Sequence, residues 1–184
     1  MPGVMPIGRS KLGIVRFLSL VVAASLAAAM LVPLTVAKEV KARSTTSAVN
    51  SPICTAAKDQ EGPSLISDGA GGAIITWTDN RSGAYDIYAQ RVNSAGVPQW
   101  TGDGVAICTA ANGQEDLDAI SDGAGGAIIA WMDGRSGSHD IYAQRVSQSG
   151  APQWTSNGVA VCTAVNGQGF PGLVPDGSGG ATVI

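Results

Sequence analysis

The chain repeats itself with a period of 54 residues, and this period constrains the fold more than any other feature of the sequence. Cys54 recurs as Cys108 and Cys162. Roughly two-thirds of residues 54–104 are identical to their counterparts in residues 108–158. Several other positions recur at the same spacing: Asp68, Trp77, Asp86 and Trp100 return as Asp122, Trp131, Asp140 and Trp154. A fixed period of this length indicates one supersecondary unit that packs against copies of itself.

Within one repeat, the residue pattern is typical of β-strands joined by tight turns. Residues 73–78 are rich in β-branched and aromatic side chains, and residues 86–92 alternate between apolar and polar ones. A glycine-rich turn at 68–72 and a polar loop at 79–84 separate these stretches. The four predicted strands include residues 65–67, 73–78, 86–92 and 105–108. No stretch of the repeat shows a helical pattern.

Four antiparallel strands in 54 residues are the usual content of one β-propeller blade. A parallel β-helix has much shorter coils, and an immunoglobulin-type sandwich needs about 100 residues per domain. The sequence therefore predicts an all-β protein made of four-stranded antiparallel propeller blades. A stack of four-stranded sheets that does not close into a ring is the alternative.

The repeats divide the exported part of the chain into blades. Residues 51–104 form the first predicted blade repeat, residues 105–158 the second, and residues 159–184 a partial third. The third copy stops where the earlier copies lead into Trp77 and Trp131, so we expect the chain to be the first part of a longer protein with further blades.

The segment that precedes the first complete set of strands also has a counterpart in the repeat. Residues 51–55 align with residues 105–109, at the end of the fourth strand. A terminal outer strand can complete the last blade of a propeller and so remove an open sheet edge. Pro52 is compatible with this position, because an outermost strand can lack one backbone donor. We therefore expect Ile53 to lie in such a strand of the closed ring.

The first 37 residues have the pattern of a secretory signal peptide. Arg9, Lys11 and Arg16 precede an apolar run at residues 17–37, and small residues follow at two possible cleavage sites, after Ala37 or after Ala42. The apolar run is also long enough for an uncleaved membrane anchor. Either way, the repeats are predicted to be exported, and residues 38–50 to form a polar linker.

Charge and cysteine content exclude some classes of function. The net charge is −3 and becomes more negative when the basic leader is removed, which argues against nucleic acid and anionic lipid as partners. Each repeat carries one cysteine at the end of its outer strand, too far from the next for a disulfide. The cysteines are therefore interpreted as small buried side chains, and not as metal ligands.

The polar loop between the second and third strands carries the most site-like cluster. Asp79, Arg81 and Asp86 recur as Asp133, Arg135 and Asp140. Two carboxylates that flank a glycine-containing loop are able to bind Ca²⁺. The structural alternative is that Asp79 accepts hydrogen bonds from the loop backbone while Arg81 pairs with Asp86. Recurrence in both complete copies favours the structural role.

The other candidates have simpler interpretations. The turn at 68–72 lacks the helix and the lysine of a phosphate-binding loop, so it is predicted to be a hairpin turn. Trp77 and Trp131 are expected to pack between blades, whereas Trp100 and Trp154 are the better candidates for exposed sugar contacts. His139 is the sole histidine of the chain and replaces Tyr85 of the first copy, so no histidine-based triad or zinc site is predicted.

The run from Ser67 to Val92, and its copy from Ser121 to Val146, resembles the repeats of large secreted bacterial β-propeller proteins of the sialidase-like or BNR-like kind. The resemblance covers residues 51–184. It implies a propeller fold and an extracellular location. The aspartate box of true sialidases has Ser-x-Asp-x-Gly-x-x-Trp spacing, which Ser67, Asp68 and Trp77 do not match, so no catalytic residue of that family carries over.

Taken together, these patterns predict an extracytoplasmic propeller module that binds or scaffolds, secreted or at the cell surface. No catalytic, cofactor-binding or metal-binding residue is assigned, with Ca²⁺ at the Asp79 and Asp133 loops as the open alternative. The expected partners are an unidentified protein or carbohydrate and the remaining blades of the same chain. The rival hypothesis is the N-terminal part of a secreted glycosidase-like hydrolase whose catalytic residues lie in other blades.

Overall fold

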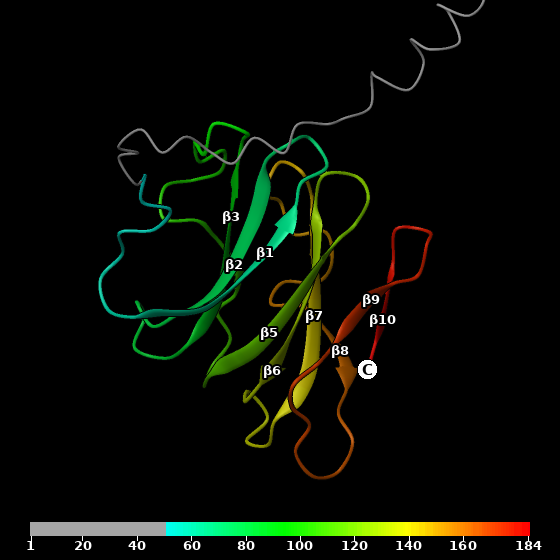
Figure 1. Ribbon diagram of the computed structural model, residues 1–184. Coiled ribbons are helices and arrows are strands. Elements are labelled where there is room, and N and C mark those ends of the chain that lie inside the picture. The colour runs from blue at the N-terminus through cyan, green and yellow to red at the C-terminus, as the bar shows by residue number, and fades with distance from the viewer. Residues whose placement is uncertain (1–50) are drawn as a thin grey trace, which may run out of the picture. The chain divides into compact units, whose positions relative to one another are not determined.

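A computed structural model describes residues 51–184 (Figure 1). The predicted leader or anchor at 1–37 and the predicted linker at 38–50 lie outside the described residues. Residues 51–184 contain only β-strands, turns and loops. In this part of the chain, no helix has the length and apolar character needed to cross a membrane.

The first four strands form a four-stranded antiparallel sheet, as the sequence predicts, and the fourth of them lies just beyond the boundary predicted for the first repeat, at residue 104. Each repeat is named below by its sheet. The strands of the first sheet follow one another in chain order, so each is joined to its neighbour by a hairpin connection. They are β1 (Gln60–Ser67), β2 (Ala73–Asp79), β3 (Asp86–Val92) and β4 (Val105–Cys108).

The second repeat forms a second sheet of the same design. Its strands are β5 (Gln114–Ser121), β6 (Ala127–Asp133), β7 (Asp140–Val146) and β8 (Val159–Cys162). The register repeats with the sequence period: Asp79 pairs with Asp86 across β2 and β3, and Asp133 pairs with Asp140 across β6 and β7. The third repeat contributes the antiparallel pair β9 (Leu173–Pro175) and β10 (Ala181–Val183).

The two sheets pack through a shared apolar core. The largest buried cluster takes side chains from both repeats, because the apolar faces of β2, β3 and β4 meet those of β5 and β6. Its members include Ile74, Ile87, Ile107, Ile129 and Trp131. A smaller cluster around Ala130 and Leu173 joins the second sheet to β9 and β10.

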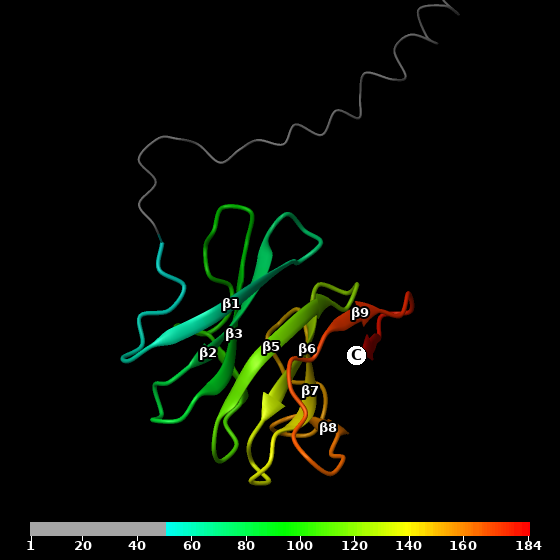
Figure 2. The ribbon, with the colours of Figure 1, turned by 60° about the horizontal axis from the view of Figure 1, so that its bottom comes forward.

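The first strands of successive repeats lie next to each other. β1 contacts β5, and β5 contacts β9. Two views, related by a 60° turn, show β1 and β5 running side by side while the remaining strands of each sheet fan away from them (Figures 1 and 2). Loops that connect β2 to β3, and those that connect one repeat to the next, therefore gather at one end of the sheets.

Residues 51–55 lie outside the sheets of the described chain, whereas their counterparts Val105–Cys108 form β4. The strand bonds of β4 come from β3. The segment nevertheless makes the contacts of its counterpart. The Thr55 amide donates to Asp103 Oδ1, as the Thr109 amide donates to Asn157 Oδ1. The ring-closing role of Ile53 stays a prediction.

Candidate functional site

The Asp79 carboxylate at the end of β2 is fully buried and accepts hydrogen bonds on both oxygens. Its Oδ1 accepts from the backbone N and the Nε of Arg81, both at 2.9 Å. Its Oδ2 accepts from Arg81 Nη2 at 2.6 Å and from the Trp77 indole at 2.8 Å. Asp133 has the same partners in the second sheet, with Arg135 Nη2 at 2.6 Å and the Trp131 indole at 2.7 Å. Each carboxylate is therefore paired with the arginine that lies two residues later in the chain.

Burial by itself raises the pKa of the Asp79 carboxyl, but the hydrogen bonds from Arg81 and Trp77 outweigh it and lower the pKa to about 2. The balance has the same sign at Asp133, where Arg135 and Trp131 lower the pKa against the effect of burial. Both groups are ionised at neutral pH. Because their charges are matched by guanidinium groups, they act as anchors for the loop.

The predicted ion pair between Arg81 and Asp86 is wrong. Arg81 folds back onto Asp79, two residues earlier, because its backbone amide and its guanidinium reach the same carboxylate. Its guanidinium also lies over the Tyr88 ring, with the central carbon 3.9 Å from the ring centroid. Asp86 instead accepts a hydrogen bond from Ser82 Oγ at 2.7 Å. Burial raises the pKa of the Asp86 carboxyl, and the hydrogen bond from Ser82 and the charge of Arg81 offset this only in part.

These contacts also bear on the Ca²⁺ hypothesis. Ca²⁺ needs six to eight oxygen ligands. The oxygens of Asp79 and Asp133 are already used by arginine and tryptophan donors. Among residues 51–184, no group of three or more His, Cys, Asp or Glu side chains is arranged to hold a metal ion.

Cys54 and Cys108 each contact the aspartate–arginine pair of the sheet that follows them along the chain. Arg81 Nη2 lies 3.2 Å from Cys54 Sγ, and Arg135 Nη2 lies 3.2 Å from Cys108 Sγ. All three cysteines are free thiols. Burial raises the pKa of Cys108 to about 12, so this thiol is protonated and unreactive at neutral pH. Cys108, at the end of β4, therefore packs the first sheet against the second.

The glycine-rich turns are hairpin turns, as predicted. Asp68 Oδ1 accepts from the amides of Ala70 and Gly72, and its Oδ2 accepts from Arg91 Nε at 3.0 Å. A Cβ at Gly72 would lie 2.1 Å from the Val92 carbonyl, so no larger residue fits there. This turn therefore closes the β1–β2 hairpin, and the Asp68 carboxylate already accepts from two of its amides.

The exposure of one tryptophan differs from the prediction. Trp77 and Trp131 are buried, as expected. Trp100 is partly buried instead of exposed, because its indole donates to the Gln148 carbonyl of the next repeat at 3.0 Å and its ring covers Gly150. Trp154, its counterpart, remains 39% exposed.

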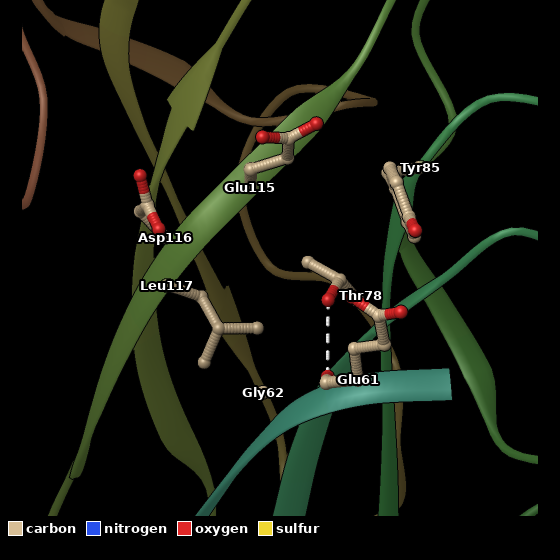
Figure 3. A pocket seen from close by; sticks show the side chains of 7 residues that line it. All are labelled: Glu61, Gly62, Thr78, Tyr85, Glu115, Asp116 and Leu117. Carbon is tan, nitrogen blue, oxygen red and sulfur yellow. Dashed lines mark hydrogen bonds between the residues drawn. The ribbon is translucent and has the colours of Figure 1, made fainter. Parts of the chain in front are cut away.

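One end of the sheets carries a pocket that sequence reasoning missed. It lies between β1 and β5 and has a volume of about 300 Å³. Its lining residues are Glu61, Gly62, Thr78, Tyr85, Glu115, Asp116 and Leu117 (Figure 3). Figure 3 shows Glu61 and Thr78 on one side, with Glu115, Asp116 and Leu117 of β5 on the other. The Thr78 hydroxyl donates to the Glu61 carbonyl at 3.0 Å.

The pocket is held between two repeats by the main chain. The Gln114 amide, at the start of β5, donates to the Tyr85 carbonyl at 2.8 Å. Nearby carboxylates, above all that of Glu61, raise the pKa of the Tyr85 hydroxyl. The pocket is therefore a negatively charged surface with one phenol, and its wall positions are fixed by backbone bonds.

A β-bulge shapes this end of each sheet. The register of β1 shifts between Glu61 and Ser64, and that of β5 shifts between Glu115 and Asp118. The residue at each of these two bulges has a left-handed backbone: Gly62 and Asp116, with φ of 55° and 49°. Their counterpart in the third repeat, Phe170, lies ahead of β9 and has φ of 52°. Only glycine adopts this conformation without cost. Phe170 is nevertheless 82% exposed, so its ring gains nothing from burial that would offset the strain.

The bulge is one of two places where the first two copies differ most, and the turn at 93–97 is the other. The glycine-rich turn at 68–72, the second and third strands and the aspartate–arginine loop are nearly identical between the first two repeats. At the bulge, Glu61-Gly62-Pro63 is replaced by Glu115-Asp116-Leu117 and then by Gly169-Phe170-Pro171. His139, which takes the place of Tyr85, is exposed at the same end. A constant framework thus presents different side chains at equivalent positions.

Comparisons of this chain with protein-family models, with curated proteins and with solved structures find no match. The resemblance to secreted propeller repeats stays a prediction.

Proposed function

We propose that the two sheets are successive blades of a β-propeller, and that the chain is an exported, non-catalytic binding module. Three features support the propeller: four strands per repeat in chain order, first strands that contact one another from repeat to repeat, and apolar packing between sheets. They also fit the geometry in which first strands surround a central axis.

The binding function is inferred from one contrast: the strands and turns are nearly the same in each repeat, whereas the side chains at the bulge differ. The repeats keep the same backbone, including the left-handed residue, while the side chains at the bulge change from copy to copy. Structural requirements would select glycine at each bulge, because it removes the strain. Retention of Asp116 and Phe170 therefore indicates that these side chains are used at the surface.

The chemistry of this face suits a polysaccharide. Carboxylates accept hydrogen bonds from sugar hydroxyl groups, and exposed aromatic rings pack on the apolar faces of sugar rings. Glu61, Glu115 and Asp116 supply the first kind of contact, and Tyr85 and Phe170 supply the second. The pocket of about 300 Å³ is at the small end of the range for a small ligand, which suits one sugar unit of a polymer.

The experiment is retention of the full chain on insoluble cellulose, chitin and chitosan, measured as protein depleted from solution. A bulge-face variant, Glu61→Gln with Glu115→Gln and Phe170→Gly, is compared with a control variant at the other end of the sheets, Val97→Ser with Gln148→Ala. We expect retention on at least one polymer, unchanged in the control variant and lost in the bulge-face variant.

Equal retention of the two variants, or none on all three polymers, would overturn the polysaccharide-binding proposal. Release of soluble reducing ends during incubation would favour the rival hydrolase. The prediction that the chain is exported is tested separately. After expression with its own leader, intact-mass measurement should find a chain that begins after Ala37 or Ala42, and an intact Met1 in the membrane fraction would indicate an anchor.

A further inference from the structure

Two Asn-Gly pairs lie in connections of the second sheet. Asn112-Gly113 belongs to the loop that joins β4 to β5, and Asn157-Gly158 ends the turn that precedes β8. Both asparagines have a left-handed backbone, with φ of 63° and 61°. Asparagine tolerates this conformation better than most residues do, because its short polar side chain bonds to nearby backbone groups. The two pairs thus share their sequence and the conformation of the asparagine, and they differ in their hydrogen bonds.

An asparagine that precedes glycine is prone to one covalent reaction. The main-chain nitrogen of the glycine attacks the side-chain carbonyl carbon, Cγ, of the asparagine. The new N–Cγ bond closes a succinimide ring, the Cγ–Nδ2 bond breaks, and the leaving nitrogen takes up the proton of the glycine amide and departs as ammonia. Water then opens the ring at either of its carbonyls, which yields aspartate or isoaspartate. Glycine favours the attack because it has no Cβ to hinder the approach.

The contacts of Asn157-Gly158 oppose this reaction. The attacking group, the Gly158 amide, donates to the Thr155 carbonyl at 2.9 Å, and Gly158 itself is buried. The side chain is fixed as well, because Asn157 Oδ1 accepts from the Thr109 amide at 3.0 Å. The Asn157 carbonyl accepts from Arg135 Nη2 at 2.7 Å. Attack on Cγ therefore requires several of these hydrogen bonds to break together.

Asn112-Gly113 has fewer restraints. Asn112 is exposed, and its side chain makes one hydrogen bond within residues 51–184, from Nδ2 to the Gly134 carbonyl at 3.0 Å. In the same part of the chain, the structure shows no acceptor for the Gly113 amide. Gln114 Nε2 donates to the Asn112 carbonyl at 3.2 Å, which holds the loop but involves neither the attacking nitrogen nor Cγ. The reaction therefore has to break a single side-chain bond at the surface.

We propose that Asn112-Gly113 is a modification site, at which the folded chain deamidates through a succinimide while Asn157-Gly158 is protected. The reaction removes the Nδ2 donor to the Gly134 carbonyl and leaves a carboxylate in its place. Isoaspartate also adds one carbon to the main chain just before Gly113, whose carbonyl accepts from the Gly134 amide at 2.8 Å. Both changes weaken the contact between the start of β5 and the end of β6. The reaction needs no ligand and is independent of the proposed polysaccharide binding.

The test is peptide mapping of the full chain during incubation at mildly alkaline pH. Mass spectrometry with fragmentation follows the conversion at positions 112 and 157, and methylation by an isoaspartyl methyltransferase identifies isoaspartate. Gly113→Ala is the matched variant. The backbone of Gly113 is not left-handed, and an added Cβ would lie 3.2 Å from Glu115 Oε1, the end of a flexible side chain, so the fold tolerates alanine. A urea-unfolded sample is the second control, because it lacks the contacts that distinguish the two pairs.

In the folded chain we expect deamidation at position 112 to be at least about tenfold faster than at position 157, because more hydrogen bonds must break at Asn157. Gly113→Ala should slow the reaction at position 112 and leave that at position 157 unchanged. In urea the two positions should react at similar rates. Equal rates in the folded chain, a difference that persists in urea, or no effect of Gly113→Ala would overturn the proposal.

The effect of the modification on the fold is measured on the same material. The form that mapping shows to be deamidated at position 112 is separated by anion exchange, and its unfolding in urea is compared with that of the unmodified chain. We expect a lower urea midpoint, because the contact between β5 and β6 is weakened. An unchanged midpoint would overturn the predicted weakening of this contact.

Discussion

At the scale of single residues, the pair of Arg135 and Asp133 illustrates how this protein keeps charge inside a small β-sheet. The guanidinium stacks on Tyr142 and reaches the Asn157 carbonyl and Cys108 as well as the carboxylate. Removal of one partner of a buried ion pair leaves the other without compensation, which costs more than the pair itself contributes.

We therefore expect Arg135→Met to lower the free energy of unfolding by about 3 kcal/mol. Arg145→Met in the same sheet is the matched control. Arg145 is more exposed, with 34% of its side chain accessible against 22% for Arg135, so its loss should cost about 1 kcal/mol. Urea unfolding followed by tryptophan fluorescence measures both. Equal losses for the two variants would contradict the special role of the loop arginine.

Asp79 and Asp86 are predicted to have opposite pH dependence. The pKa of Asp79 is lowered from an ordinary 3.8 to about 2, so its stabilising effect is complete above about pH 4 and is lost as the pH falls towards 2. Asp79→Asn should therefore cost up to about 2 kcal/mol at pH 7, and the difference from the wild type should shrink between pH 4 and pH 2.

Asp86→Asn is the control for this pH series. Burial raises the pKa of Asp86, so its ionised form opposes folding at neutral pH and this effect is relieved as the pH falls. Asparagine still accepts the Ser82 hydroxyl, and we expect no loss of stability at pH 7. Urea midpoints from pH 7 to pH 2 measure both variants. A destabilised Asp86→Asn chain would show that this carboxylate has an ionic partner.

At the scale of strands and loops, the sequence patterns located most of the sheet and missed one feature. The predicted stretches 73–78, 86–92 and 105–108 match β2, β3 and β4 closely. β1 begins at Gln60, five residues before the predicted stretch. The bulge breaks the alternation on which strand prediction depends, and Pro63 is tolerated because β1 is an edge strand. The candidate pocket escaped notice for the same reason.

The left-handed backbone at the bulge predicts that a side chain at Gly62 lowers the stability of the fold. An added Cβ there meets nothing closer than Thr78 Oγ1 at 3.8 Å, so Gly62→Ala has no steric clash and its cost comes from the backbone at φ 55°. We expect a loss of about 1 kcal/mol. Gly102→Ala, where no atom lies within 4 Å and φ is not left-handed, should be neutral or slightly stabilising.

The reverse change, Phe170→Gly, tests the same strain in the third repeat. We expect it to raise the free energy of unfolding by about 1 kcal/mol, because it relieves φ of 52° and exposes no core. Phe170→Ala keeps the strained backbone and should change stability little. Chemical unfolding measures the free energy of unfolding of both variants. An equal gain in stability for Phe170→Ala would show that the exposed ring, and not the strained backbone, is the cause.

At the scale of the whole molecule, the 54-residue period predicted the repeating sheet well and the contacts between sheets poorly. Periodicity reports which residues share a role, so four strands per repeat and their order could be derived. It does not show that Cys108 and Trp100 reach into the next repeat, because equivalent positions look the same whether their partner lies in their own copy or in its neighbour. Export and ring closure stay predictions for a different reason, because they depend on residues outside the two described sheets.

Coupling between repeats is measurable with one matched pair of tryptophans. Trp100 donates to the Gln148 carbonyl and packs over Gly150, so it contacts both sheets. Trp154 has the same place in the second repeat and is 39% exposed. We expect Trp100→Ala to lower the free energy of unfolding by about 3 kcal/mol, and Trp154→Ala by about 1 kcal/mol or less.

The shape of the unfolding curve tests the physical reason. In a repeat protein, stability depends on interfaces between neighbours as well as on each unit. Loss of the Trp100 contact should therefore broaden the urea transition or divide it in two, as the sheets begin to unfold separately, while Trp154→Ala leaves a single transition of unchanged slope. Similar losses with unchanged slopes for both variants would mean that the two sheets are held together by their buried aliphatic core alone.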